Sequence, residues 1–436
     1  MPSSESEYPP KCCRHLPETS GEVQKLRLLV FGINFAPELT GIGKYTGEMA
    51  EWFAGRGHRV EVVTAPPYYP EWKVRSGFSG SRWVRHLWGP GADIQVTRCP
   101  LWLPRKVTGM RRLLHLSSFA ISSIPALVSA AMRRPAVLML VVPTLATVPA
   151  SLMVAWLWRI PIWLHVQDLE VDAMLSMNIV GGGHRFGRFA LAVESWLLRR
   201  FDRVSSISTR MVERLVEKGV ARDRVFEFPN WVDLESIQPL DGPNPLRSAL
   251  GLREEDICIL YSGNMGEKQG IEVVVEAARL LATRQDIRFV LCGDGAARER
   301  LQKTSEGLPN IAWWPLQPAD RLNALLNAAD IHVLPQRAEA ADLVMPSKLT
   351  GMLASGRAVV GTADAETGLG TVLADCGVRV DPGDPAALAS AIAALASDRE
   401  QRAVLGRRGR QYAMKHLSRD RILATVEEQL ITLGAR

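Results

Sequence analysis

The sequence predicts two doubly wound α/β domains of similar size, joined by one linker. Short apolar runs typical of buried parallel strands alternate with helical patterns in both halves of the chain. A break rich in Pro, Gly and Asn separates the halves at 239–251. The 436 residues, 47% of them hydrophobic and 22% charged, fit two or three globular domains and exclude a disordered, collagen-like or coiled-coil chain.

The first domain opens with a strand, a loop, a helix and a second strand. Residues 1–24 are polar and lack the apolar core of a signal peptide, so we expect a disordered tail there. The strand at Leu26–Ile33 leads into a loop with Gly and Pro at Asn34–Gly43. A helix at about Tyr45–Arg56 and a strand at Arg59–Thr64 complete the unit. This order is typical of a doubly wound domain.

A region without acidic residues follows, from Ile94 to Gln167, and it holds eight Lys and Arg. Within it, Pro135–Trp158 carries no charge and is long enough to span a bilayer. However, Val137–Val142, Ala150–Trp158 and Ile160–Val166 have the lengths and patterns of a strand, a helix and a strand. We therefore favour a buried βαβ unit over a transmembrane helix.

The segment Arg105–Met132 has apolar residues at helical spacing and four cations in its first turns. Two interpretations stay open, an ordinary helix packed on a sheet and a monotopic helix that touches anionic lipid. The basic, Trp-rich first half suits an anionic membrane surface better than nucleic acid, because no nucleic-acid-binding motif is present.

The second half repeats the α/β pattern after a late strand at Val225–Phe228. We expect domains at 25–238 and 239–416, with a C-terminal helix within 417–436. The predicted strands of this half are Ile257–Ser262, Arg288–Leu291, Ile331–Leu334 and Ala358–Gly361, and the helices are Ile271–Ala282, Pro385–Ala396, Arg402–His416 and Arg419–Leu433. Ligands of open α/β sheets bind beyond the carboxyl ends of the strands, so we expect the site in a cleft between the two domains.

Three loops at strand ends have the residues of a phosphate-binding site. Glycines between a strand and a helix let backbone N–H groups approach an anion, and a lysine at a helix start opposes the helix dipole unless an anion is bound there. Each loop alone is also compatible with a tight turn or a solvated lysine, but together the two lysines look like a diphosphate clamp. The candidate residues of this site are Gly41, Gly43, Gly263, Asn264, Lys268, Ser347 and Lys348, with Gly293 at the end of a further strand.

His165 ends a predicted strand, where a functional histidine and a core histidine are both plausible. Tyr68, Tyr69 and Trp72 follow the second strand and could stack a sugar or grip a lipid headgroup, although a rigid surface loop is equally compatible. No CxxC, HExxH or EF-hand motif and no aspartate cluster occurs, so we expect no metal. The six cysteines indicate apolar filler in a reducing cytosol.

The string from Phe31 to Tyr45 resembles the opening of family 4 glycosyltransferases, which have the GT-B fold of two Rossmann-like domains facing an interdomain cleft. Its continuation at 64–70 is similar to the colanic-acid branch of that family. Ordered matches run from about residue 26 to 385, including His165–Asp168, Pro229–Asp233, Gly263–Gly270, Cys292–Gly295 and Met345–Gly356.

The resemblance implies a retaining, metal-independent transfer of a sugar from a nucleotide diphosphate sugar, such as GDP-fucose or another GDP- or UDP-sugar, to a glycan. Carried over, Gly41 and Gly43 approach the donor phosphate, His165 lies near the transferred sugar, and Lys268 binds the diphosphate. Tyr45, Tyr68, Tyr69 and Trp72 are the candidates for contact with the acceptor. The C-terminal helix is expected to cross back onto the first domain.

Two departures from the family pattern concern charge. Asn264 stands where many members have Arg, and Lys348 is our candidate for the replacement charge. The family's pair of glutamates eight residues apart is absent, with Gly351 at the second position, and Glu339 is the candidate for a carboxylate near the donor sugar.

The leading hypothesis is a glycosyltransferase of exopolysaccharide or lipopolysaccharide assembly. It would need no cofactor, bind a lipid-linked glycan and an anionic membrane surface but no nucleic acid, and lie peripherally on the inner face of the plasma membrane. A nucleotide-sugar epimerase of the same architecture and a non-catalytic membrane scaffold are the alternatives.

Overall fold

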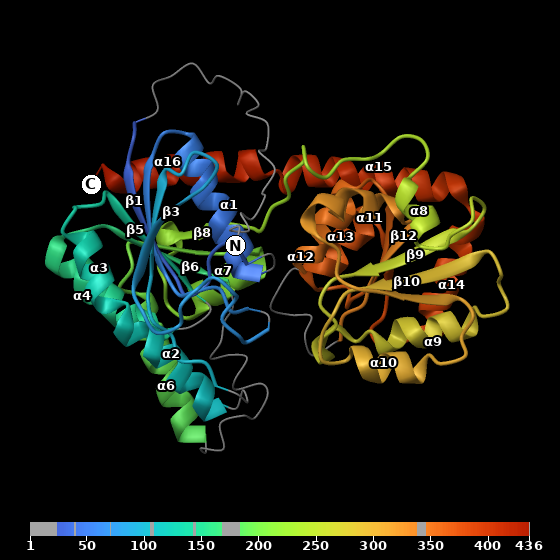
Figure 1. The fold of residues 1–436 in the computed structure, drawn as a ribbon, viewed down its shortest axis with the longest axis horizontal. Helices are drawn as coiled ribbons and strands as arrows, with labels where there is room; N and C mark the ends of the chain where they lie inside the picture. The colour runs from blue at the N-terminus through green and yellow to red at the C-terminus, as the bar shows by residue number, and fades with distance from the viewer. Residues whose placement is uncertain are drawn as a thin grey trace, which may run out of the picture. The chain divides into compact units, whose positions relative to one another are not determined.

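The computed structural model describes residues 24–38, 41–69, 71–104, 109–142, 145–167, 184–337 and 346–435. It divides into two compact units. Unit 1 comprises Met1–Ser205, Lys218–Phe226 and Thr425–Arg436, and unit 2 comprises Ser206–Glu217 and Glu227–Ala424. Each unit is built on a central sheet flanked by helices (Figure 1). The predicted class of two doubly wound α/β domains is confirmed.

The first sheet has eight strands in the order β3-β4-β2-β1-β5-β6-β7-β8. The β2–β1, β1–β5, β2–β4 and β5–β6 pairs are parallel, and the edge strand β3 pairs antiparallel with β4. All six residues of β5 are buried, as expected for a strand covered on both faces. The strands are β1 (Arg27–Phe31), β2 (Arg59–Thr64), β3 (Val84–Trp88), β4 (Ile94–Arg98), β5 (Val137–Val142), β6 (Ile162–Val166), β7 (Arg203–Ser206) and β8 (Val225–Glu227).

The helices of the first half differ in two places from the sequence prediction. Helix α1 (Gly41–Gly55) begins four residues early, because Gly41 adopts a φ of 63° that turns the chain directly into the helix. The long amphipathic segment forms two helices, α2 (Gly109–Ser122) and α3 (Ile124–Ala131), and 105–108 lie outside the described residues. A proline in the first turn of α3 suits a helix start. The remaining helices are α4 (Val148–Trp158), α6 (His184–Leu198) and α7 (Thr209–Glu217), with short 3-10 turns η1 (Leu145–Thr147) and η2 (Arg222–Arg224).

The uncharged segment forms β5, α4 and β6, as the βαβ interpretation predicted. Among the described residues, one other stretch is long and apolar enough to cross a membrane by length and composition alone. It is Met110–Ala131, and 39% of its most apolar window is buried inside the protein.

The second sheet has six strands in the order β11-β10-β9-β12-β13-β14, and its paired strands are parallel. Asp384 and Asp398 each accept a backbone N–H at 2.8 Å and so cap the last two helices of the unit. The strands are β9 (Ile257–Ser262), β10 (Ile287–Cys292), β11 (Ile311–Trp314), β12 (Ile331–Leu334), β13 (Ala358–Thr362) and β14 (Val378–Val380). The helices are α8 (Pro245–Ala249), η3 (Glu267–Gln269), α9 (Glu272–Leu280), α10 (Arg298–Thr304), η4 (Ala319–Arg321), α11 (Leu322–Ala328), α12 (Ser347–Ala354), α13 (Gly368–Cys376), α14 (Pro385–Ser397) and α15 (Arg399–His416).

The chain joins unit 2 at Glu227, before the break predicted at 239–251. Hydrogen bonds to the end of the chain explain the difference. The N–H of Val232 donates to the carbonyl of Leu417 at 2.8 Å, and Arg419 pairs with Asp233 at 2.8 Å. Arg410 donates to the carbonyl of Ile237 at 2.7 Å. These contacts make residues 232–237 part of unit 2. The amino-acid composition of this segment gives no sign that a domain boundary precedes it.

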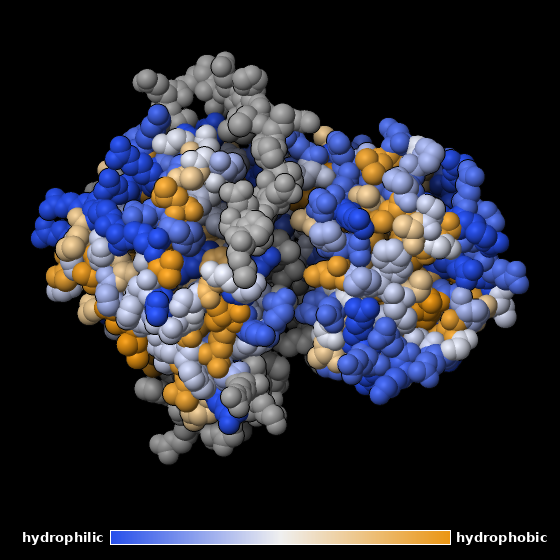
Figure 2. Space-filling model, in the orientation of Figure 1, coloured by the Kyte–Doolittle hydropathy of each residue, from blue (hydrophilic) through white to orange (hydrophobic). Residues whose placement is uncertain are grey.

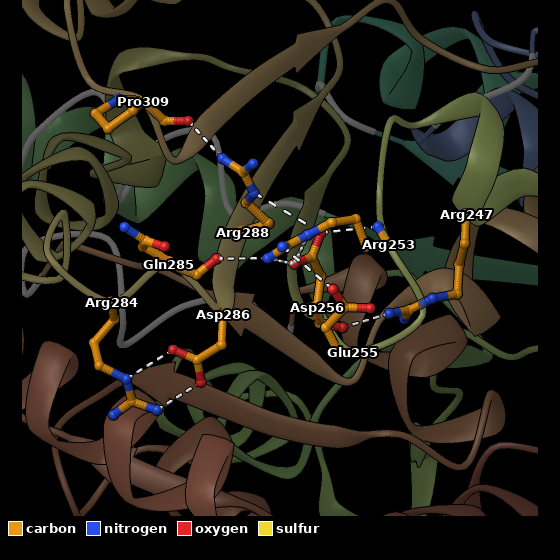
Figure 3. A network of polar contacts seen from close by, with 9 residues as sticks. All are labelled: Arg247, Arg253, Glu255, Asp256, Arg284, Gln285, Asp286, Arg288 and Pro309. Atoms are coloured by element: carbon orange, nitrogen blue, oxygen red, sulfur yellow. Dashed lines mark hydrogen bonds and ion pairs between the residues drawn. The ribbon is translucent and has the colours of Figure 1, made fainter.

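A network of charged side chains lies at the amino ends of β9 and β10 (Figure 3). The buried carboxylate of Asp256 accepts three hydrogen bonds from Arg253, at 2.7 to 3.0 Å. Arg284 and Asp286 form a two-point pair at 2.7 and 2.8 Å. The charged groups of this network are paired with one another at the amino ends of the strands. Ligands of open α/β sheets bind at the opposite, carboxyl ends, where we expect the binding site.

The C-terminal helix α16 (Arg419–Gly434) is attached to α1 and β2 by a buried carboxylate. Glu427, which is 4% exposed, accepts from Arg56 at 3.0 Å and lies 2.7 Å from His58 Nε2. His58 Nδ1 accepts a hydrogen bond from the N–H of Leu26 at 3.1 Å. The ring proton is therefore on Nε2, which donates the hydrogen bond to Glu427. All four residues belong to unit 1.

We predict that Glu427→Ala lowers the free energy of unfolding of unit 1 by about 3 kcal/mol, because it leaves the buried His58 and the partly buried Arg56 without their acceptor. Calorimetry of the full chain is the measurement. The control is Glu428→Ala, at an exposed position one residue on, with an expected change below about 0.5 kcal/mol. Equal melting of the two variants would contradict the prediction.

Candidate functional site

In unit 2, the loops after β9 and β10 touch backbone to backbone. The N–H of Gly263 donates to the carbonyl of Cys292 at 2.9 Å, and that of Met265 donates to Asp294 at 2.7 Å. Gly293 has a φ of 154°, and a Cβ on it would lie 1.9 Å from the carbonyl oxygen of Gly263. The contact therefore requires glycine at position 293, so that no Cβ separates the two loops at the carboxyl edge of the sheet.

Lys348, in the first turn of α12, reaches this bare edge. Its ammonium donates to the carbonyl of Asn264 at 3.0 Å and to the hydroxyl of Tyr261, and it lies 4.2 Å from the centre of the Tyr261 ring. The Tyr261 hydroxyl donates to the same carbonyl at 2.5 Å. A Cβ at Gly263 would lie 2.5 Å from Lys348 Cε, so the glycine also makes room for the lysine stem.

Burial lowers the pKa of Lys348 from 10.5 to about 7. Among the described residues, no carboxylate forms an ion pair with this ammonium, and the groups in contact with it are a phenol and a carbonyl. A cation that is desolvated without a counter-charge is suited to receive an anionic ligand. The geometry thus joins Lys348 to Gly263, Asn264 and Gly293, four of the predicted donor-binding residues.

The other predicted residues of this half contribute less. Ser347 is exposed and is the first residue of α12, whose N-cap is Pro346, so the predicted capping position is taken by a proline. The backbone of Lys268 lies in η3, but its side chain lies outside the described residues, as does Glu339. A Cβ on Gly351 would lie 3.2 Å from Leu326, so this position faces the core of unit 2.

In unit 1, the loop between β1 and α1 is held by the buried carboxylate of Glu38. It accepts the N–H groups of Tyr68 and Tyr69 at 3.2 and 3.1 Å and the amide of Asn34 at 3.0 Å. Burial raises the pKa of Glu38 despite these hydrogen bonds. A Cβ on Gly43 would lie 2.3 Å from the carboxylate, so this predicted phosphate-binding glycine serves to admit Glu38.

Arg98 ends β4 and is 1% exposed. It donates to the carbonyls of Ala65 and Ala36 at 3.0 and 2.6 Å, and burial lowers its pKa to about 10. Its guanidinium therefore ties the loop after β2 to the loop after β1. Sequence reasoning missed both Glu38 and Arg98, since an isolated charge at a strand end gives no signal of its burial.

The predicted acceptor residues form an aromatic cluster with a histidine of α2. The hydroxyl of Tyr68 lies 3.2 Å from His115 Nε2, and Trp72 packs against both rings at centroid distances of 5.7 and 5.2 Å. Tyr69 is 38% exposed and lies beside Gly41, where a Cβ would be 3.8 Å from its ring. Tyr45 is 4% exposed, so it offers an acceptor little surface.

His165 is held as a neutral, buried side chain at the end of β6. Its Nδ1 lies 2.9 Å from the Ser205 hydroxyl, and its Nε2 lies 2.8 Å from the Gln167 amide nitrogen. Burial lowers its pKa to about 3, so it is uncharged at neutral pH. This geometry favours a positioning role over proton transfer.

No group of three or more His, Cys, Asp or Glu side chains within the described ranges is arranged to hold a metal ion.

Comparison with known proteins accounts for most of the chain. A glycosyl transferase 4-like domain matches residues 40–231, and a domain of the glycosyl transferases group 1 matches residues 256–398. The chain is 45% identical over 351 residues to a protein of Escherichia coli strain K12 that is described as a colanic acid biosynthesis glycosyl transferase, WcaI. The match covers 79% of this chain and 85% of that protein.

Two solved structures share the fold. Sucrose-phosphate synthase from Thermosynechococcus elongatus superposes with a TM-score of 0.72 and 17% identity, covering 94% of this chain and all of that one. HepE from Anabaena, solved in complex with UDP, gives a TM-score of 0.67 at 14% identity over 93% of this chain and all of that one. At these identities the likeness shows the fold, which is GT-B.

We predict that Lys348→Met raises the melting temperature at neutral pH. The cost of charging a buried lysine is fully present below pH 7, where the folded protein must protonate it, and is relieved as the pH rises toward 10.5. The stabilisation should therefore shrink between these values. Thermal unfolding across this range is the measurement, with the exposed Lys303→Met as control. Stabilisation that does not vary with pH would contradict the assignment.

Proposed function

This chain belongs to the glycosyltransferases that combine a 4-like domain with a group 1 domain, and we propose that it transfers a sugar, with retention, from a nucleotide diphosphate sugar to a lipid-linked glycan. The observation that carries the donor half of this proposal is the ammonium of Lys348 at the glycine edge of unit 2.

A nucleotide diphosphate fits that edge by charge and by shape. The backbone contact of Gly263 with Gly293 removes the side chains that would keep a phosphate at a distance. Lys348 then supplies the positive charge that Asn264, an uncharged amide, does not. When the bond between the sugar and the diphosphate breaks, negative charge grows on the leaving phosphate, and a nearby ammonium stabilises it. We propose the same role for Lys268.

The proposed reaction needs no strong base from the protein. The leaving diphosphate can take the proton of the acceptor hydroxyl on the face where the new bond forms, which is consistent with retention. His165 is neutral and buried, so we assign it to holding Gln167 at the end of β6.

The acceptor half rests on unit 1. Of the large apolar side chains exposed within the described residues, fifteen lie in unit 1 and three in unit 2. Figure 2 shows hydrophobic side chains gathered over the part of unit 1 where α2, α3 and α4 lie. Arginines border these helices, and acidic residues are absent from 94–167. Such a surface suits an anionic bilayer, and we propose peripheral binding at the cytoplasmic face of the plasma membrane.

The relative from Escherichia coli suggests the pathway class. Its description names colanic acid biosynthesis, and we propose that this chain likewise acts in the assembly of an exopolysaccharide on a lipid carrier. GDP-fucose and other GDP- or UDP-sugars are the donors to test, because no described side chain identifies the base.

We predict that one nucleoside diphosphate among GDP, UDP, ADP and TDP stabilises the protein without added metal, by roughly 2.7 kcal/mol at about 100 times its Kd. CMP serves as the monophosphate control. Calorimetric titration should show a roughly 10-fold or greater loss of affinity in Lys348→Ala and Lys268→Ala, and no change in Lys303→Ala.

The affinity of the wild type should rise as the pH falls from 8 to 6, because Lys348, with a pKa of about 7, gains its proton in this range. A folded protein that binds none of these nucleotides would favour the non-catalytic scaffold, and turnover to a free sugar without an acceptor would favour the epimerase.

We also predict that Trp156→Glu in α4, where the side chain is 78% exposed, releases the protein from vesicles that contain phosphatidylglycerol. The matched control is Leu280→Glu in unit 2, at a side chain that is 57% exposed. Vesicle flotation is the measurement. Equal binding of the two variants would exclude α4 from the membrane contact.

A further inference from the structure

Tyr261 connects the core of unit 2 to the lysine at its edge. It lies on β9, which pairs with β10 on one side and with β12 on the other. Its side chain is fully buried, in the same apolar cluster as Met265 and Ile271. The ring is therefore a fixed part of the sheet, and a group that it holds is placed by the fold.

The hydroxyl of Tyr261 has a fixed direction. It donates to the carbonyl of Asn264 at 2.5 Å, so its lone pairs face the ammonium of Lys348, which donates to it. Burial raises the pKa of Tyr261, so the hydroxyl keeps its proton over the whole range in which Lys348 titrates. Toward the lysine, the phenol therefore acts only as an acceptor.

Lys348 is held from two sides. The face of the Tyr261 ring lies 4.2 Å from the ammonium, within the range of a cation–π contact, and the carbonyl of Asn264 accepts from it at 3.0 Å. An ammonium has three N–H donors. Among the described residues, the phenol and the carbonyl take two of them, and the third is left for a ligand.

We propose that Tyr261 is the positioning residue of the diphosphate site, because its ring and its hydroxyl hold the ammonium of Lys348 charged and in place before the ligand binds. The proposal rests on the proposed function, in which Lys348 binds the diphosphate. A lysine that is already ordered loses little side-chain entropy on binding. The acceptor oxygen beside it favours the ammonium over the neutral amine, whereas burial favours the amine. These two effects together set the pH range in which the site is charged.

The charged side chains of the elements packed on α12 lie away from Lys348. This helix packs against β12, β13 and α15. His332 of β12 and Arg410 of α15 contact its C-terminal end, at Ser355 and Ala354, whereas Lys348 lies in its first turn. No residue of β13 is charged.

Two charged side chains of the neighbouring loops are also engaged elsewhere. Asp294, after β10, accepts from the N–H of the next residue at 2.8 Å. Arg337, after β12, pairs with Glu272 at 3.1 Å. Among the side chains that the structure describes, Tyr261 is thus the titratable group in contact with Lys348.

The first test measures the charge of Lys348 without any ligand. An N-hydroxysuccinimide ester acylates only the neutral amine, and peptide mass spectrometry then gives the labelled fraction at each pH. The midpoint should lie at about pH 7 in the wild type. Tyr261→Phe keeps the ring but removes the acceptor oxygen, so the midpoint should fall by about one pH unit. An unchanged midpoint would overturn the proposal.

Three controls accompany this measurement. Tyr412→Phe makes the same change in α15, where the half-buried ring lies against His416, and should leave the midpoint unchanged. The exposed Lys303, labelled in the same samples, shows whether a variant is folded, because an unfolded chain would label Lys348 alike. Tyr261→Met, which fills the core without ring or hydroxyl, is the second variant and should lower the midpoint further.

The second test is a double-mutant cycle with the nucleoside diphosphate that stabilises the wild type. At pH 7, Tyr261→Phe should raise its Kd roughly 3- to 10-fold. Affinity is present below the pKa of Lys348 and is lost as the pH rises through it, so the variant should lose affinity at a lower pH. In the Lys348→Met background, Tyr261→Phe should have no effect. An equal loss in both backgrounds would show that Tyr261 acts independently of the lysine and would overturn the proposal.

The two tests separate this proposal from the proposed function. A labelling midpoint that moves in Tyr261→Phe, in a protein that binds none of the nucleotides, would retain the positioning of Lys348 and refute the diphosphate site. Nucleotide binding that depends on Lys348, with a midpoint that Tyr261→Phe does not move, would retain the proposed function and refute the role of Tyr261.

Discussion

The backbone contact between Gly263 and Gly293 determines what unit 2 can bind. A Cβ at position 293 would lie 1.9 Å from the carbonyl oxygen of Gly263, so the two loops approach this closely only because residue 293 is glycine. The approach places backbone groups at the carboxyl edge of the sheet, and it opens the space into which Lys348 extends. Among the described residues, this edge offers main chain and the ammonium of Lys348, a combination suited to phosphate and poorly suited to an apolar group.

In unit 1, two buried charged side chains hold the loops that follow β1 and β2. Glu38, in the loop after β1, accepts hydrogen bonds from the N–H groups of two successive tyrosines in the loop after β2. Arg98 donates hydrogen bonds to one carbonyl in each of these two loops. Neither ion is exposed to water, so each must be satisfied by the backbone or cost several kcal/mol. The loops after β1 and β2 are thereby held in one arrangement, and Tyr69 is presented beside Gly41. The strand-end loops of unit 1 are thus held by buried charged side chains. Those of unit 2 are held by direct backbone contact, which glycine makes possible.

The sequence predicts the strands better than the connections between them. The bounds of β2, β5, β9 and β12 follow from short runs rich in Val, Ile and Leu, which need only local information. The sequence pattern predicts a loop at Asn34–Gly43, whereas α1 begins at Gly41, where a positive φ starts the helix. Residues 232–237 precede the predicted break at 239–251 and belong to unit 2. Residues 232–237 are held by the side chains and backbone of residues almost two hundred positions away, and no local composition records such contacts.

The departures from the family pattern become understandable when charge is followed through space. The resemblance to the family leads us to expect a positive charge after the loop glycine, where this chain has the uncharged Asn264. The carbonyl oxygen of Asn264 receives the ammonium of Lys348 from a different helix, more than eighty positions further along the chain. Gly351 faces Leu326, so this position of α12 is used for packing. Absence of one motif residue therefore does not by itself imply absence of a charge at that place in space. Desolvation disfavours the charged form of Lys348 and lowers its pKa, and an anion bound beside the ammonium would offset that loss of hydration.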